Sequence, residues 1–149
     1  AMIAMAQTAI SYNLVRPALS CYGAINIEQG RHPLFELMGQ SFVANSFTSD
    51  EDDCKIAILF GPNSCGKSVY LKQVSLIVYL AHIGSYVPAR SAQISIVDQI
   101  FTRIRTPESI STQLSSFKHD LNQMIMATKY ASRRSLVVID FFGKGIPVM

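Results

Sequence analysis

The order of apolar and polar residues divides the chain into short extended segments and three helices. Residues 2–15 are mostly small and apolar, which predicts a helix that ends before Pro17, because proline cannot continue it. Residues 69–83 and 117–131 repeat apolar side chains every three to four positions, the period of an amphipathic helix. The predicted extended segments are residues 24–27, 41–47, 55–60, 92–96, 99–104 and 136–139.

Two of these segments predict the fold class. Residues 55–60 (KIAILF) are expected to form a buried strand that runs into a glycine-rich turn and then a helix. Residues 136–139 (LVVI) show no alternation, which is typical of a central parallel strand covered on both faces. We therefore predict an α/β fold with a mainly parallel central sheet, in which these two strands lie side by side and the turn lies at their carboxyl ends.

Composition is that of a globular protein, and charge adds little to the picture. The 149 residues have the length of one domain or of part of a larger one, with 49% hydrophobic and 15% charged residues. The formal net charge is +3, and four of the ten acidic residues occupy residues 50–53, a predicted solvated loop. The basic residues of the second half are spread over several elements: Arg103, Arg105, Lys118, Lys129, Arg133 and Arg134. This spread favours a solvated surface over direct DNA contact.

Cysteine usage and hydropathy exclude several other classes. Cys21, Cys54 and Cys65 form no C-x-x-C pair, which argues against a disulfide framework and a zinc site and fits a reducing compartment. The apolar stretches at residues 1–10 and 74–83 are too short to span a bilayer, and no basic segment precedes the first. We therefore expect a soluble chain without a targeting or transmembrane segment.

The strongest chemical signal lies between the predicted strand at 55–60 and the helix at 69–83. The segment fits the phosphate-loop (Walker A) pattern G-x-x-x-x-G-K-[ST] at every fixed position. It consists of Gly61, Pro62, Asn63, Ser64, Cys65, Gly66, Lys67 and Ser68. The N–H groups of such a loop surround phosphate oxygens at a helix N-terminus. Lys67 is expected to contact the β- and γ-phosphates and Ser68 to hold Mg²⁺. Because a strand and a helix flank the loop, we favour this reading over a chance glycine-rich turn.

An acidic residue at the end of a neighbouring strand commonly completes such a site by holding Mg²⁺, directly or through water. Asp140 follows the predicted strand at 136–139 and is the candidate, the alternative being a turn residue. The next residue is Phe141, whose ring can neither accept a proton nor orient a water molecule. Loss of a positioned base costs about 10²–10⁴-fold in rate. The sequence therefore predicts a site that holds a nucleotide but lacks a group for its hydrolysis.

Residues 61–73, GPNSCGKSVYLKQ, resemble the phosphate loop of the MutS DNA mismatch-repair ATPases. Further blocks similar to that family, in the same order, are residues 15–17, 30–36, 83–89, 100–104 and 136–145. The resemblance covers nearly all of the chain and implies a P-loop NTPase domain of the ABC-like ATPase group. It also implies ATP and Mg²⁺ as cofactors, and binding of mismatched or branched DNA by the full-length family.

Three blocks narrow the resemblance to one branch of the family. Residues 108–111, 120–123 and 142–145 are most similar to the fifth eukaryotic MutS homologue, which acts in meiotic recombination. The resemblance thus implies a second MutS homologue subunit, of the fourth-homologue type, as the partner in a heterodimer. It implies a nuclear location as well.

The same resemblance assigns three residues outside the loop. Phe42 and Val43 align with the segment that packs on the adenine ring, although a plain core role for Phe42 is an equal alternative. Ser115 aligns with a serine that reaches the γ-phosphate held by the partner subunit, a contact made in trans. Phe141 stands where the family has a glutamate that orients the attacking water, so the resemblance implies that this chain lacks that carboxylate.

The family pattern also predicts the domain organisation. Residues 1–20 resemble the end of the lever helix, and residues 21–149 the N-terminal part of the ATPase domain. Residues 146–149 depart from the family's threonine-rich continuation, so we expect an incomplete, C-terminally truncated domain. Two functions follow as hypotheses: the ATP-binding part of a MutS-type protein, or a non-catalytic module that binds nucleotide or a partner. An unrelated P-loop kinase is a weaker third, because no arginine-rich lid segment is apparent.

Overall fold

The computed structural model describes residues 2–21, 23–39, 42–49, 56–104 and 113–140, with residues 2 and 113–119 described by their backbone alone. The chain forms two compact units, Ala1–Ile96 and Val97–Met149, and each is described by itself. Of the helices in the described part of the chain, none is both long enough and apolar enough to cross a bilayer.

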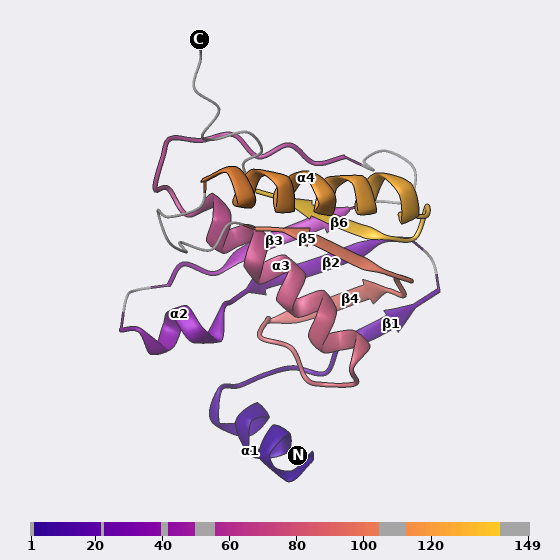
Figure 1. Ribbon diagram of the computed structural model, residues 1–149. Coiled ribbons are helices and arrows are strands. Elements are labelled where there is room, and N and C mark those ends of the chain that lie inside the picture. Colours follow the sequence, from indigo (N-terminus) through magenta and orange to yellow (C-terminus); the bar gives the residue numbers. More distant parts are fainter. Residues whose placement is uncertain (1, 22, 40–41, 50–55, 105–112, 141–149) are drawn as a thin grey trace. The chain divides into compact units, whose positions relative to one another are not determined.

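The first unit is a mixed four-stranded sheet with one long helix across it (Figure 1). Its elements are α1 (Met2–Ser11), β1 (Ala18–Ser20), β2 (Ile25–Gly30), α2 (Pro33–Leu37), β3 (Asn45–Ser49), α3 (Lys67–His82) and β4 (Ser91–Ser95). The strand order is β1-β4-β2-β3. β1 runs parallel to β4, whereas β2 is antiparallel to both of its neighbours.

The core of the first unit lies between α3 and the sheet. On β2 the buried Ile25 and Ile27 alternate with exposed residues, so one face of the strand is apolar. α3 turns a face of Val74, Ile77, Val78 and Ala81 inward, at the spacing expected of an amphipathic helix. Full burial of one such aliphatic side chain contributes about 1.5–3 kcal/mol. This packing fixes where α3 begins and therefore where the phosphate loop lies.

The second unit contains β5 (Ile100–Arg103), α4 (Gln113–Tyr130) and β6 (Leu136–Ile139). β5 and β6 pair in parallel, from Ile100 opposite Leu136 to Arg103 opposite Ile139. α4 runs along this two-stranded sheet (Figure 1) and buries Ala127. The parallel orientation predicted for residues 136–139 is therefore confirmed, but the partner is β5, and Val137 and Ile139 are 39% and 41% exposed, so coverage on both faces is not seen within this unit.

The prediction of a mainly parallel central sheet is wrong for the first unit. Residues 56–60 do not form a strand, and Ile56 and Phe60 are 78% and 87% exposed. An apolar run is buried only as a strand inside a sheet whose two faces are covered, and the sheet of the first unit is formed by four other strands. The alignment of residues 55–60 beside β6 thus stays a prediction, and Lys55 lies outside the described residues.

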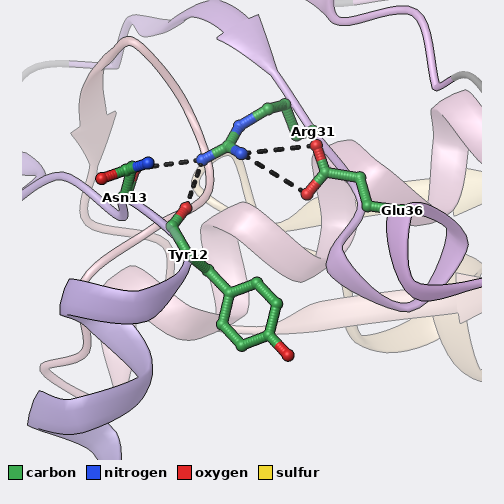
Figure 2. A network of polar contacts seen from close by, with 4 residues as sticks. All are labelled: Tyr12, Asn13, Arg31 and Glu36. Carbon is green, nitrogen blue, oxygen red and sulfur yellow. Dashed lines mark hydrogen bonds and ion pairs between the residues drawn. The ribbon is translucent and has the colours of Figure 1, made fainter.

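One guanidinium group joins three parts of the first unit. Arg31, directly after β2, donates from Nη2 to the carbonyl oxygens of Tyr12 (2.8 Å) and Asn13 (3.0 Å), just beyond α1. Its Nη1 lies 3.3 Å from Oε1 of Glu36 on α2. Figure 2 shows these contacts converging on the guanidinium from two directions. Arg31 therefore ties the end of α1 to α2, and its backbone N–H adds a 2.8 Å bond to Pro88.

We predict that Arg31→Lys lowers the free energy of unfolding by about 1–2 kcal/mol, because a single compact nitrogen cannot reproduce the planar fork that reaches Glu36 with Nη1 and the two carbonyls with Nη2. Arg90→Lys is the matched control, since Arg90 pairs with Glu28 at an exposed site and its loss should cost less than about 0.5 kcal/mol. Urea unfolding followed by circular dichroism measures both. Equal shifts in the two variants would contradict a special role for the Arg31 contacts.

Candidate functional site

The phosphate loop leads directly into α3, and its backbone is shaped by two residues with positive φ. Ser64 has φ +62° and Gly66, the N-cap of α3, has φ +95°. Because Gly66 supplies no side-chain cap, the first N–H groups of the helix remain available to an external acceptor. A helix N-terminus of this kind favours an anion through its N–H groups and its dipole.

The two glycines of the loop are required for different reasons. A Cβ built on Gly61 would lie 2.9 Å from Sγ of Cys65, closer than real Cβ atoms come. A Cβ on Gly66 would meet nothing within 4 Å, so only its left-handed backbone restricts that position. Gly61 is required because the sulfur of Cys65 lies too close for a side chain, and Gly66 because its backbone is left-handed.

The side chain of Lys67 folds back onto the start of the loop. Its Nζ donates to the carbonyl oxygens of Gly61 (2.7 Å) and Pro62, and lies 3.6 Å from Sγ of Cys65. An ammonium group has three donors, and the contact to sulfur is the weak one of the three. Lys67 therefore holds a positive charge at the centre of the loop with one donor able to turn toward an anion.

A cavity of about 650 Å³ opens beside the loop within the first unit. This volume falls within the range of small-molecule sites, about 300–1,000 Å³. Among its walls are two residues assigned by resemblance, Phe42 and Val43, and four residues of the loop: Ser64, Cys65, Gly66 and Lys67. Phe42 is half-buried and Val43 is exposed, so neither is enclosed in the core. The structure thus brings the candidate base-packing segment and the loop to one cavity.

The remaining loop residues do not line the cavity. Pro62 and Asn63 are exposed. Ser68 is half-buried in the first turn of α3, directly after Lys67.

Sequence reasoning missed other residues that line the cavity. Tyr70 and Gln73 of α3, Phe35 of α2 and residues 45–46 of β3 all contribute to its walls. Gln73 is fully buried on an otherwise apolar helix face, and this polar residue in an apolar pattern was the signal available in the sequence. Burial raises the pKa of Tyr70, so its hydroxyl stays protonated and able to donate.

The wall that contains α2 is braced by ring packing. Phe35 meets His32 edge to face, with 4.8 Å between ring centroids. Burial lowers the pKa of His32 below its usual value, which favours the neutral ring. A neutral, buried imidazole packs against Phe35 without adding a charge beside Lys72.

Asp140 lies in the second unit, directly after β6, and is buried. Its N–H donates to the carbonyl of Arg103 (2.7 Å), and Nη1 of Arg103 donates back to the Asp140 carbonyl (3.1 Å). Arg103 is itself buried and forms an ion pair with Asp120 of α4. These contacts fix the backbone of Asp140 to β5 and α4, whereas its relation to Ser68 in the first unit stays a prediction.

Two predicted site residues cannot be placed. The backbone of Ser115 belongs to the first turn of α4, but its side chain lies outside the described residues. Phe141 lies outside them entirely. Ser68 and Asp140 each carry side-chain oxygen, the ligand type that Mg²⁺ takes, and their sharing of one ion stays a prediction.

Comparison with known proteins identifies the family. Residues 57–149 match the family described as MutS domain V. The chain is 43% identical over 144 residues to the DNA mismatch repair protein MutS of Dehalococcoides mccartyi, which covers 95% of this chain and 17% of that protein. It is 46% identical over 130 residues to MutS protein homolog 5 of Caenorhabditis elegans, which covers 87% of this chain and 10% of that protein.

A third relative, the DNA mismatch repair protein MutS of Alkaliphilus metalliredigens, is 40% identical over 146 residues, 97% of this chain. The chain thus spans less than a fifth of the length of the curated relatives that it matches. The resemblance seen in the loop and its flanking blocks extends over most of the sequence. The chain belongs to the MutS family, and its residues 57–149 correspond to MutS domain V.

Proposed function

We propose that this chain is the ATP-binding part of a MutS-type protein that acts on DNA. One observation carries the proposal: the loop, the open N-terminus of α3 and the Lys67 ammonium all face a cavity of about 650 Å³ that Phe42 and Val43 help to enclose. Such a cavity offers an apolar wall to a base and donors to a phosphate chain. It thereby fits the two ends of a nucleotide.

The roles proposed for the residues follow from their positions. The N–H groups around Gly66 and the ammonium of Lys67 bind the phosphates, and Phe42 with Val43 packs on the adenine. The oxygens of Ser68 and Asp140 would hold Mg²⁺, which neutralises charge that develops on the phosphates. In hydrolysis by the complete protein, water would attack the γ-phosphate, and Ser115 would contribute to the site of a partner subunit.

The wider role is proposed from the relatives. Two of them are named DNA mismatch repair proteins and one is named MutS protein homolog 5. We propose DNA as the substrate of the complete protein and a second MutS homologue as its partner. The similarity to the fifth-homologue sequence favours the meiotic-recombination branch, with a partner of the fourth-homologue type and a nuclear location.

A second function, a non-catalytic nucleotide-binding module, is favoured by one residue. Phe141 stands beside the candidate metal ligand Asp140, where the family's water-orienting glutamate is expected. Binding through Gly66, Lys67 and Ser68 does not depend on that carboxylate, whereas hydrolysis does. Nucleotide binding without turnover is thus the behaviour proposed for this chain.

We predict that Lys67→Ala weakens ATP binding at least tenfold, since it removes a direct phosphate contact worth about 1.5–3 kcal/mol. Ser115→Ala is the control and should leave binding by the isolated chain unchanged, because this serine is assigned to a partner's site. Titration with a fluorescent ATP analogue measures both. A large loss in the serine variant would contradict the assignment in trans.

A pair of glycine variants tests the geometry of the loop. Gly61→Ala should weaken ATP binding, because its Cβ would lie 2.9 Å from Sγ of Cys65. Adding Cys65→Ala removes that sulfur and should restore binding to within about threefold of the parent chain (about 0.7 kcal/mol). Gly66→Ala should not be rescued in this way, since its cost of about 1–2 kcal/mol comes from the left-handed backbone. A double variant as weak as Gly61→Ala would show that the contact with sulfur is not the constraint.

We also predict that the chain releases no phosphate from Mg²⁺–ATP above background, because Phe141 cannot orient the attacking water. The measurement is a phosphate-release assay on the purified chain and on Phe141→Glu. Recovery of turnover in Phe141→Glu would favour the family's enzymatic role, and silence in both forms the non-catalytic module. Clear release by the unmodified chain would refute the prediction.

A further inference from the structure

Two side chains of α3 reach across the cavity wall to the start of β3. The hydroxyl of Tyr70 donates to the carbonyl of Ser46 (2.9 Å), and Nε2 of Gln73 donates to the carbonyl of Asn45 (3.0 Å). The two donors are three residues apart and so lie on the same face of the helix. They hold two successive carbonyls of the strand that begins just after the candidate base-packing residues Phe42 and Val43.

The burial of Gln73 shows how tightly this contact is built. Its side chain is 0% exposed, and a Cβ added to Gly30 would lie 2.4 Å from its Nε2. Its Oε1 is buried and has no hydrogen-bond partner within the described residues. An unpaired buried acceptor costs about 1–3 kcal/mol, which offsets the gain from the bond that Nε2 donates to Asn45. The placement of Gln73 therefore calls for a reason other than stability.

The ladder that pairs this part of β3 with β2 is irregular. The register between β2 and β3 shifts between Ile27 and Gly30, and Gln29 adopts φ +49° within that irregularity. The N–H of Gln29 donates to the hydroxyl of Ser46 (3.0 Å) instead of to a strand carbonyl. Irregularities of this kind re-aim a strand near functional sites. The side chains of α3 add two hydrogen bonds to the strand at this irregular point.

We propose that Tyr70 and Gln73 are positioning residues that set the Phe42–Val43 wall at a fixed separation from the phosphate loop. This inference rests on the proposed nucleotide site. α3 begins at Lys67, within the loop. Tyr70 and Gln73 follow Lys67 by three and six residues, a rise along the helix axis of about 4.5 and 9 Å. A single rigid helix thus carries the phosphate-binding end and the attachment of the base-packing wall. The two hydrogen bonds from Tyr70 and Gln73 align the wall that packs on the base, while the loop alone binds the phosphates.

The proposal separates two ligands that share the phosphate chain. Tyr70→Phe and Gln73→Met each remove one donor while nearly preserving shape. In titration calorimetry with Mg²⁺–ATP, each variant should bind about 5- to 10-fold more weakly, the size of one net hydrogen bond. With inorganic triphosphate as the probe, affinity should stay within about twofold of the parent chain. Gln73 is fully buried within the cavity wall and donates to Asn45, so we expect its effect to be exerted through that strand residue.

Matched controls come from the same chain. Tyr79→Phe lies on α3 at a 54% exposed position away from the cavity, and Gln93→Met lies at an exposed position of β4. Both should leave the two affinities unchanged. Thermal unfolding of every variant accompanies the titrations, and Tyr70→Phe is the decisive variant if Gln73→Met does not fold.

Each outcome decides the question. A loss confined to ATP supports the proposal, whereas equal losses for ATP and triphosphate would show a merely structural role and overturn it. Unchanged ATP affinity in a folded Tyr70→Phe would overturn it as well. If the parent chain binds triphosphate but gains nothing from the adenosine, the base-packing wall is wrong. If it binds neither ligand, the proposed function itself fails.

Discussion

The burial of one face of α3 against the mixed sheet is the interaction on which the first unit depends. Ile77 and Val78 are fully buried, as are Ile27 and Ile94 of the sheet. Four such side chains contribute several times the free energy of any single polar contact in the unit, about 1.5–3 kcal/mol each against about 0.5–1.5. The apolar face therefore fixes the axis of the helix. The polar contacts of Tyr70 and Gln73 near its N-terminal end then set the position of the start of β3 relative to it.

Local signals predicted the elements well where the information was local. The strand at residues 136–139 has the predicted bounds, and α3 begins within two residues of the expected start. The prediction of a strand at residues 56–60 failed because an apolar run shows that burial is favourable but does not show which elements would cover it. β3 begins at Asn45 rather than at residue 41, because its bounds follow from the pairing with Gly30 across an irregular register.

The candidate site divides in the same way. The loop residues were predicted because their spacing is fixed over eight positions by the geometry of phosphate binding. Tyr70 and Gln73 lie in the block that resembles the family, but their role was missed because their partners are backbone carbonyls 24 and 28 residues away, whose positions the sequence does not reveal. Phe42 and Val43 were reached through family resemblance rather than through their own chemistry. Pairing Asp140 with Ser68 needs the two units together, which no local pattern specifies.

Arg31 gives the first unit a mechanical property that no single element has. Its guanidinium holds the carbonyls after α1 on one side and Glu36 of α2 on the other, and Phe35, the neighbour of Glu36, lines the cavity. A torque applied to α1 is therefore resisted at the wall of the cavity rather than absorbed in the turn at residues 12–13. Displacing that wall, in turn, loads the same three contacts from the opposite end. The end of α1 and the helix α2 are thus coupled through the guanidinium of Arg31.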